Sequence, residues 1–233
     1  VGHDTYAELA LSLLRAGGVD LAGVRTVAGS TGIASITVTD DGENAIVVVA
    51  GANAHARAEQ VPDARLRAAD AWLVLQHECP PAANTALLAR ARACGARTLL
   101  NAAPARELRA DELAGVDVLV VNESEAEALA ARHGLPGAPE DFARALHART
   151  GRTVVVTLGA AGALAMEGGV LSRQPASPVN VVDTTGAGDA FTAGFLREWD
   201  AGRGLESAVA AGHAAARAVV GGAGADAWET PTP

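Results

Sequence analysis

The segment DTTGAGDAFTAGFL, residues 183–196, contains the residues best suited to chemistry. Glycines at 186 and 188 stand directly before an apolar stretch with helical spacing, so backbone amides there would crowd the positive end of a helix dipole. Asp189 falls in the first turn of that expected helix, where the same dipole stabilises its carboxylate. A carboxylate beside an anion site suits phosphoryl transfer, which needs charge neutralisation and a base near the acceptor hydroxyl. A helix cap with permissive glycines is the alternative for the GAGD tetrapeptide alone.

Composition excludes several other chemistries. All eighteen basic residues are arginine, so a Walker-type lysine, the strand lysine of a protein kinase and a Schiff-base lysine are ruled out. A formal charge of -9 provides no broad cationic surface for nucleic acid or an anionic membrane, and a small-molecule partner is expected. Cys79 and Cys94 are too few for a disulfide framework and are expected as buried thiols. No long apolar run or signal peptide is present, which predicts a cytoplasmic protein.

The elements that must position Asp189 follow an α/β pattern. From about residue 70, short apolar runs alternate with Ala-, Leu- and Arg-rich segments, as in βα units with a parallel sheet. Strands are expected at 71–75, 97–101, 117–121 and 153–157, with further short strands in ALAME and VLSRQ between glycine turns. Residues 31–50 instead predict an antiparallel hairpin with one apolar face. Such a ribbon is marginal alone, so we expect dimerisation to bury that face.

The whole string DTTGAGDAF resembles the signature of the PfkB family of carbohydrate kinases. Further stretches resemble the ribokinases of that family, in the family's order: VGHDTYAELALSLLRAGGVD, GENAIVVVAGANA, LQHECP, NAAPAREL, NESEAEAL and TLGAAGAL. The resemblance covers nearly the whole chain. It implies one domain over residues 1–233 with a ribokinase-like three-layer α/β sandwich, a mostly parallel central sheet and a small antiparallel lid. It also implies transfer of phosphate from ATP to the primary hydroxyl of a small sugar, D-ribose above all, in a homodimer joined through the lid. Another sugar or a nucleoside as acceptor is the alternative.

The resemblance assigns roles around the acceptor hydroxyl. Asp189 would be the catalytic base, and the amides of Gly186, Ala187 and Gly188 would form the anion hole. Glu78 would accept hydrogen bonds from sugar hydroxyls, with a solvated glutamate at a strand end as the alternative. Two apolar residues that share one face of the hairpin would cover the sugar, with ordinary hairpin packing as the alternative; they are Ala34 and Ile36.

Nucleotide and magnesium contacts are implied at the ends of two predicted strands. Asn122 and Glu125 follow the strand at 117–121, where ligands of an open α/β sheet bind, and would order Mg²⁺ through water beside the phosphates. A helix-capping pair is the alternative, since Glu125 stands three residues after Asn122. The remaining nucleotide contacts would be Thr157, Gly159 and Gly188 at the phosphates and His213 against adenine. A purely structural role on its alanine-rich helix is the alternative for His213.

A monovalent-cation loop is also implied, with potassium held by hard oxygen ligands next to the anion hole. Its residues would be Asp183, Thr185, Val219, Gly222 and Gly224. The sequence departs from the family here, because Trp228 replaces a small hydroxyl-bearing residue and the loop lacks a basic residue. Ribokinases also begin with a strand and a glycine-rich segment that hold the sugar, and neither precedes Val1. We therefore expect a chain that binds ATP and Mg²⁺ but turns over little ribose alone; a remnant without turnover is a further alternative.

Overall fold

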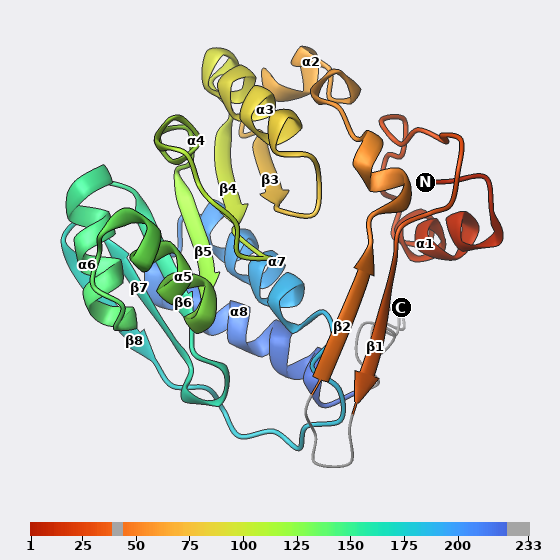
Figure 1. Cartoon of the computed structure of the whole chain (residues 1–233). Helices are drawn as coiled ribbons and strands as arrows, with labels where there is room; N and C mark the ends of the chain where they lie inside the picture. The colour runs from red at the N-terminus through yellow and green to blue at the C-terminus, as the bar shows by residue number, and fades with distance from the viewer. Residues whose placement is uncertain (39–43, 223–233) are drawn as a thin grey trace. The chain divides into compact units, whose positions relative to one another are not determined.

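The computed structural model describes residues 1–38 and 44–222 (Figure 1). The chain divides into two compact units, which we call unit 1 (Val1–Thr98) and unit 2 (Leu99–Pro233). Each unit is described by itself below. The expectation of one domain over the whole chain stays a prediction.

Unit 1 begins with a capped helix. In α1 (Thr5–Ala16) the side chain of Asp4 accepts the amide of Ala7 at 3.1 Å, as an N-cap does. The same carboxylate accepts the amide and the hydroxyl of Thr31, each at 2.7 Å, and these bonds hold the pKa of Asp4 below its ordinary value. Asp4 therefore ties the start of α1 to the segment that leads into the hairpin.

The predicted antiparallel hairpin is confirmed, but the expectation of one apolar face is wrong, because apolar residues lie on both faces. Strands β1 (Ile33–Val38) and β2 (Asn44–Val49) pair antiparallel, with Ile33 opposite Val49 and Ala34 opposite Val48. They form a separate sheet of two strands. Large apolar side chains on both strands are exposed in this chain, with Ile33 at 46%, Val47 at 65% and Val48 at 66%.

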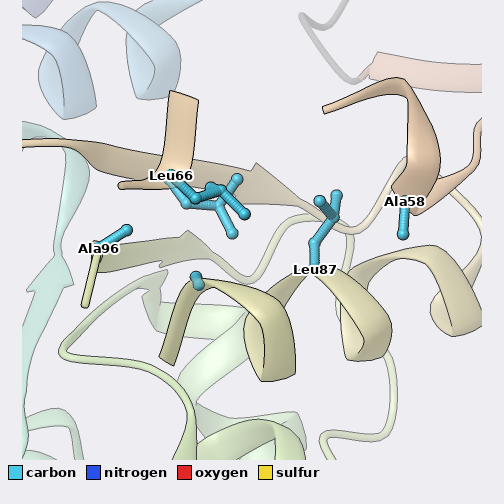
Figure 2. Close-up of a cluster of buried hydrophobic side chains, with 6 residues drawn as sticks. Ala58, Leu66, Leu87 and Ala96 are labelled. Carbon is cyan, nitrogen blue, oxygen red and sulfur yellow. The ribbon is translucent and has the colours of Figure 1, made fainter. Parts of the chain in front are cut away.

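The core of unit 1 lies where two helices and a strand pack together. These are α2 (Asp63–Leu66), β3 (Trp72–Gln76) and α3 (Pro81–Cys94). Figure 2 shows the buried cluster, in which Leu66 and Leu87 lie close to small side chains at Ala58 and Ala96. The guanidinium of Arg90 donates to the backbone carbonyl of Val61 at 2.6 Å. This hydrogen bond holds the loop before α2 against α3.

The central sheet has six strands in the order β3-β4-β5-β6-β7-β8. β4 (Arg97–Asn101), β5 (Val118–Asn122) and β6 (Thr153–Thr157) are parallel, whereas β7 (Ala163–Glu167) and β8 (Val170–Gln174) continue antiparallel. Every predicted strand of this sheet is found within one residue of its expected bounds. The prediction of a mostly parallel α/β sheet with a small antiparallel lid is therefore confirmed.

Helices cover both faces of the strands in unit 2, which is why β5 and β6 are almost continuously apolar. They are α4 (Ala110–Ala114), α5 (Glu123–His133), α6 (Pro139–Thr150), α7 (Ala187–Asp200) and α8 (Leu205–Val220). Figure 1 shows α5 and α6 on one face and α7 and α8 on the other, and this is the three-layer arrangement that was expected. No helix among the described residues is long and apolar enough to cross a membrane.

The α7–α8 pair is packed closely because glycines face the partner helix. A Cβ at Gly194 would lie 2.6 Å from the carbonyl oxygen of Ala211. A Cβ at Gly212 would lie 2.8 Å from the ring of Phe191. Neither position accepts a larger side chain without moving a helix, so the two glycines fix how α7 and α8 are aligned.

Candidate functional site

The helix predicted from DTTGAGDAF is present. Its N-cap is Gly186, whose φ of 77° lies in the left-handed region that glycine adopts without strain. Asp189 lies in the first turn and is exposed to solvent. The amide of Ala187 donates to the carbonyl of Thr184 at 3.1 Å. The amide of Gly188 lies in the first turn, where a helix provides no carbonyl to accept it. The first turn of α7 therefore places a carboxylate beside an amide suited to an anion.

A pocket of about 430 Å³ lies beside this helix start, entirely within unit 2. It brings together four of the residues predicted to bind nucleotide: Thr157, Gly159, Gly188 and His213. The other lining residues are mostly small or apolar: Ala160, Gly162, Ala176, Ser177, Pro178, Val179, Val181, Thr184, Ala187, Phe191, Ala216, Arg217 and Val220. An apolar cavity with an amide-rich end can hold a flat base and a phosphate chain.

The turn between β6 and β7, where the sequence predicts phosphate contacts, lines one part of the pocket. Thr157 is the last residue of β6, and its hydroxyl lies 3.4 Å from the carbonyl of Val121 on the neighbouring strand. Gly159 starts a short 3₁₀ turn with φ of 55°. Parallel strands end here at the carboxyl edge of the sheet, where open α/β sheets bind ligands.

His213 lies on α8 and also lines the pocket. Its ring meets the ring of Phe191 edge-on, with centroids 5.3 Å apart. Burial lowers the pKa of His213, although a hydrogen bond to the backbone of Gln174 partly opposes this, so the imidazole is neutral near pH 7. Its Nε2 is buried and lacks a hydrogen-bond partner among the residues that the structure describes. Contact with adenine stays a prediction.

Asn122 and Glu125 form a capping box at the start of α5. The side chain of Asn122 accepts the amide of Glu125, and the side chain of Glu125 accepts the amide of Asn122, both at 2.8 Å. The capping alternative is therefore present in the structure. Glu125 is buried, and loss of hydration raises its pKa. Neither residue lines the pocket, and their magnesium role stays a prediction.

The expected monovalent-cation loop is described in part. A carboxylate oxygen of Asp183 accepts the amide of Thr185 at 2.8 Å, which lowers the pKa of Asp183. The carbonyl of Val219 accepts the amide of Gly222 at 3.2 Å. An ionised carboxylate and backbone carbonyls are suitable donors for a hard cation. Gly224 and Trp228 lie outside the described residues. Within those residues, no group of three or more His, Cys, Asp or Glu side chains could hold a metal.

Apart from Asp189, which is also predicted to bind the sugar, the residues predicted to contact sugar belong to unit 1. Ala34 and Ile36 lie on β1, and their side chains are exposed on one face of the hairpin. Glu78 is exposed in the turn after β3. Next to it, burial and the charge of Glu78 raise the pKa of Cys79. The expectation of buried thiols is wrong in degree, because Cys79 and Cys94 are both free and half-buried at the ends of their elements.

Sequence reasoning missed the segment 176–181 and Arg217, which complete the pocket. Arg217 could have been found, because it follows His213 by four residues on one helix and therefore shares its face. Nothing in the sequence indicates that 176–181 crosses a pocket, since its placement depends on contacts distant along the chain.

The fold and this site define a class of proteins, and comparison with known families agrees. The model of the pfkB family of carbohydrate kinases matches residues 1–233, and the chain belongs to this family. Among curated relatives, ribokinase of Lactococcus lactis is 33% identical over 84% of this chain, and that of Haemophilus influenzae is 31% identical over 93%. The chain covers 62% of the former relative's length and 72% of the latter's.

Solved structures are similar over almost the whole chain. Ribokinase from Thermotoga maritima has a TM-score of 0.85 at 31% identity, covering 97% of this chain and 74% of that one. Adenosine kinase from Sinorhizobium meliloti has a TM-score of 0.83 at 28% identity, covering 96% of this chain and 71% of that one. The fold is thus shared by kinases whose names give different acceptors.

Proposed function

We propose that the protein transfers the γ-phosphoryl group of ATP to the primary hydroxyl of a small sugar, with D-ribose as acceptor and ribose 5-phosphate as product. The start of α7 carries this proposal, because Asp189 and the Gly188 amide lie beside a pocket of suitable size for a nucleotide. The ribokinase relatives support it. One similar structure, 29% identical with a TM-score of 0.81, is Arabidopsis thaliana ribokinase complexed with ribose and ATP.

In this proposal Asp189 is the general base. The sugar hydroxyl oxygen forms a bond to the γ-phosphorus while its proton passes to the carboxylate of Asp189, and the bond from that phosphorus to the oxygen leaving with ADP breaks. Amides of residues 186–188 and the positive end of α7 stabilise the charge on the moving group. Glu78 would accept hydrogen bonds from sugar hydroxyls, and Ala34 and Ile36 would exclude water from them.

Magnesium and potassium are part of the proposal. Mg²⁺ supplies positive charge to the phosphates, and Glu125 would orient its water ligands through a carboxylate that already accepts the amide of Asn122. Potassium would be held by oxygens of Asp183, Thr185, Val219, Gly222 and Gly224, next to the anion hole. The predicted cytoplasmic location agrees with a supply of ATP.

A second candidate is a kinase of the same chemistry with another acceptor. Fructoselysine 6-kinase of Escherichia coli is 51% identical over 73 residues, which is 31% of this chain. Adenosine kinase from Sinorhizobium meliloti has a similar fold, as given above. Acceptor choice depends on residues outside the nucleotide pocket. A nucleoside and a larger sugar derivative are therefore the alternative acceptors.

The test is an acceptor panel with the full-length protein that carries this sequence. ADP release is measured with ATP, Mg²⁺ and D-ribose, fructose, fructoselysine or adenosine, with and without K⁺. We expect the highest kcat/KM with D-ribose. Asp189→Asn should lower turnover by about a hundredfold or more, while leaving ADP affinity within a few fold, because the base acts on the acceptor. Full turnover in this variant would overturn the assignment of the base, and a preference for adenosine would support the second candidate.

A further inference from the structure

The alignment of α7 against α8 places Arg217 level with the start of α7. The two helices run antiparallel: Gly194 packs against Ala211, Phe191 packs against Gly212, and the carbonyl of Val220 accepts the amide of Val182 at 2.9 Å. Moving toward the start of α7 therefore means moving toward the end of α8. Arg217 lies between His213 and Val220, one helical turn beyond His213. Its level on α8 thus matches the amide-rich first turn of α7.

Arg217 is also the one lining residue of the pocket with a charged side chain, among the residues that the structure describes. It is exposed, and within the described parts of the chain its guanidinium forms no hydrogen bond and no ion pair. Two other arginines of unit 2 are engaged: Arg106 pairs with Glu112, and Arg152 pairs with Asp117 at 3.0 Å. The guanidinium of Arg217 is therefore available to a ligand in the pocket.

A polyphosphate in this pocket needs such a charge. The last turn of α8 presents backbone carbonyls, and the negative end of its dipole would repel an anion lying against it. The chain has no lysine, so arginine is the only permanently charged cation that it can supply. Arg217 lies in that last turn, where it offsets the dipole of α8. A guanidinium can also donate two parallel hydrogen bonds to phosphate oxygens.

We propose that Arg217 binds the phosphates of the nucleotide, opposite the amides of α7, and so sets the affinity of the protein for ADP and ATP. This inference rests on the proposed use of ATP, but it does not depend on which acceptor is phosphorylated. Arg217 is a nucleotide-binding residue here, and Asp189 remains the base. Binding through charge requires that affinity weakens as salt is added, and that this dependence is reduced when the charge is removed.

The test is isothermal titration of ADP into the full-length wild-type protein, Arg217→Ala and Arg217→Lys, at several salt concentrations. Arg217→Ala should weaken ADP binding by about ten- to a hundredfold, as for loss of a hydrogen-bonded charge, and should flatten its salt dependence. Arg217→Lys should recover part of the lost ADP affinity, because lysine keeps the positive charge but cannot donate two parallel hydrogen bonds as the planar guanidinium does. Arg132→Ala is the matched control, since Arg132 is also exposed in the last turn of a helix but lies outside the pocket.

Two results with the Arg217→Ala variant would overturn the proposal. One is ADP affinity in Arg217→Ala within twofold of the wild type. The other is weaker binding with an unchanged salt dependence, which would assign Arg217 to the base rather than the phosphates. Wild-type protein that does not bind ADP would also overturn it. Failure of the proposed sugar-kinase function would look different: ADP would bind with the salt dependence described, yet no acceptor would be phosphorylated.

Discussion

At the scale of single residues, Glu125 caps a helix and is also predicted to act at the magnesium site. Its carboxylate accepts the amide of Asn122 at 2.8 Å and so caps α5, and it is buried. Burial removes hydration from the charged form, which raises the pKa of Glu125 above its usual 4.5, while the hydrogen bond from Asn122 partly opposes this. A cap alone does not need a charge, because glutamine serves equally well at this position of a capping box. The sequence places a carboxylate there despite the cost of burying its charged form, and we propose that its second role is to orient water around Mg²⁺.

Glu125→Gln separates these two roles. The folded chain holds the proton of Glu125 more tightly than the unfolded chain, so wild-type stability contributed by this group falls as pH rises through the raised pKa. The Gln variant does not titrate, so its melting temperature should rise relative to wild type as the pH is raised above 4.5, the usual pKa of this side chain. Turnover should fall by about ten- to a hundredfold, as for a residue that orients metal ligands.

Glu123→Gln is the control for this prediction, because Glu123 lies in the same first turn of α5 but is exposed. Thermal unfolding is followed by circular dichroism and turnover by ADP release. Unchanged turnover in Glu125→Gln would leave Glu125 as a cap alone.

At the scale of elements, the side chain of His147 connects a helix, a strand and a turn of unit 2 through hydrogen bonds. It lies on α6, its Nδ1 is 2.7 Å from the carbonyl of Arg152 before β6, and its Nε2 accepts the amide of Gly169 at 3.0 Å. A carbonyl can only accept, so the proton of the neutral ring is on Nδ1. The imidazole therefore joins α6 to the start of β6 and to the turn between β7 and β8.

Replacing His147 with Phe should weaken this junction while keeping a ring of similar size. Loss of two hydrogen bonds should lower the free energy of unfolding by about 1–3 kcal/mol, measured by urea denaturation. His3→Phe, at an exposed position, should change it by less than about 0.5 kcal/mol. Equal stability of the two variants would mean that water replaces both bonds without cost.

At the scale of the whole molecule, the two-stranded sheet of β1 and β2 carries apolar residues on both faces. Ala34, Ile36 and Val48 share one face, and Ile33, Val47 and Val49 share the other. A ribbon of two strands is marginal in water without a covering surface. Because we assign the face of Ala34 and Ile36 to the sugar, the face of Val47 is available to a second copy of this chain, and we propose that the homodimer forms there.

Val47→Asp and Val48→Asp form a matched pair, since the two side chains are 65% and 66% exposed on opposite faces. A buried, unpaired carboxylate is strongly unfavourable at an interface, so Val47→Asp should shift the full-length protein from dimer to monomer. Val48→Asp should keep the dimer and raise KM for the sugar. Static light scattering at about micromolar concentration, a range where a standard interface stays associated, checks the masses. A wild-type mass equal to one chain would contradict the dimer.

The sequence by itself determined the strands of the central sheet and the start of α7. Residues 97–101 and 153–157 are short β-rich runs between helical segments, and local propensity and tertiary packing agree there. Gly186 is a comparable case, because few residues other than glycine adopt its left-handed conformation. The resemblance of DTTGAGDAF to a kinase signature then indicated Asp189, which the structure places in the expected first turn.

Tertiary structure alone decided which residues share the pocket and which carboxylates lose their water. The segment 176–181 and Arg217 line one pocket with Gly188. Arg217 reaches it because Gly194 and Gly212 let α7 and α8 pack closely, and such packing joins positions distant along the chain. The raised pKa of Glu125 also depends on neighbours that exclude water, whereas its capping bonds depend only on a spacing of three residues. Local geometry is encoded in short segments, but burial is a property of the assembled fold.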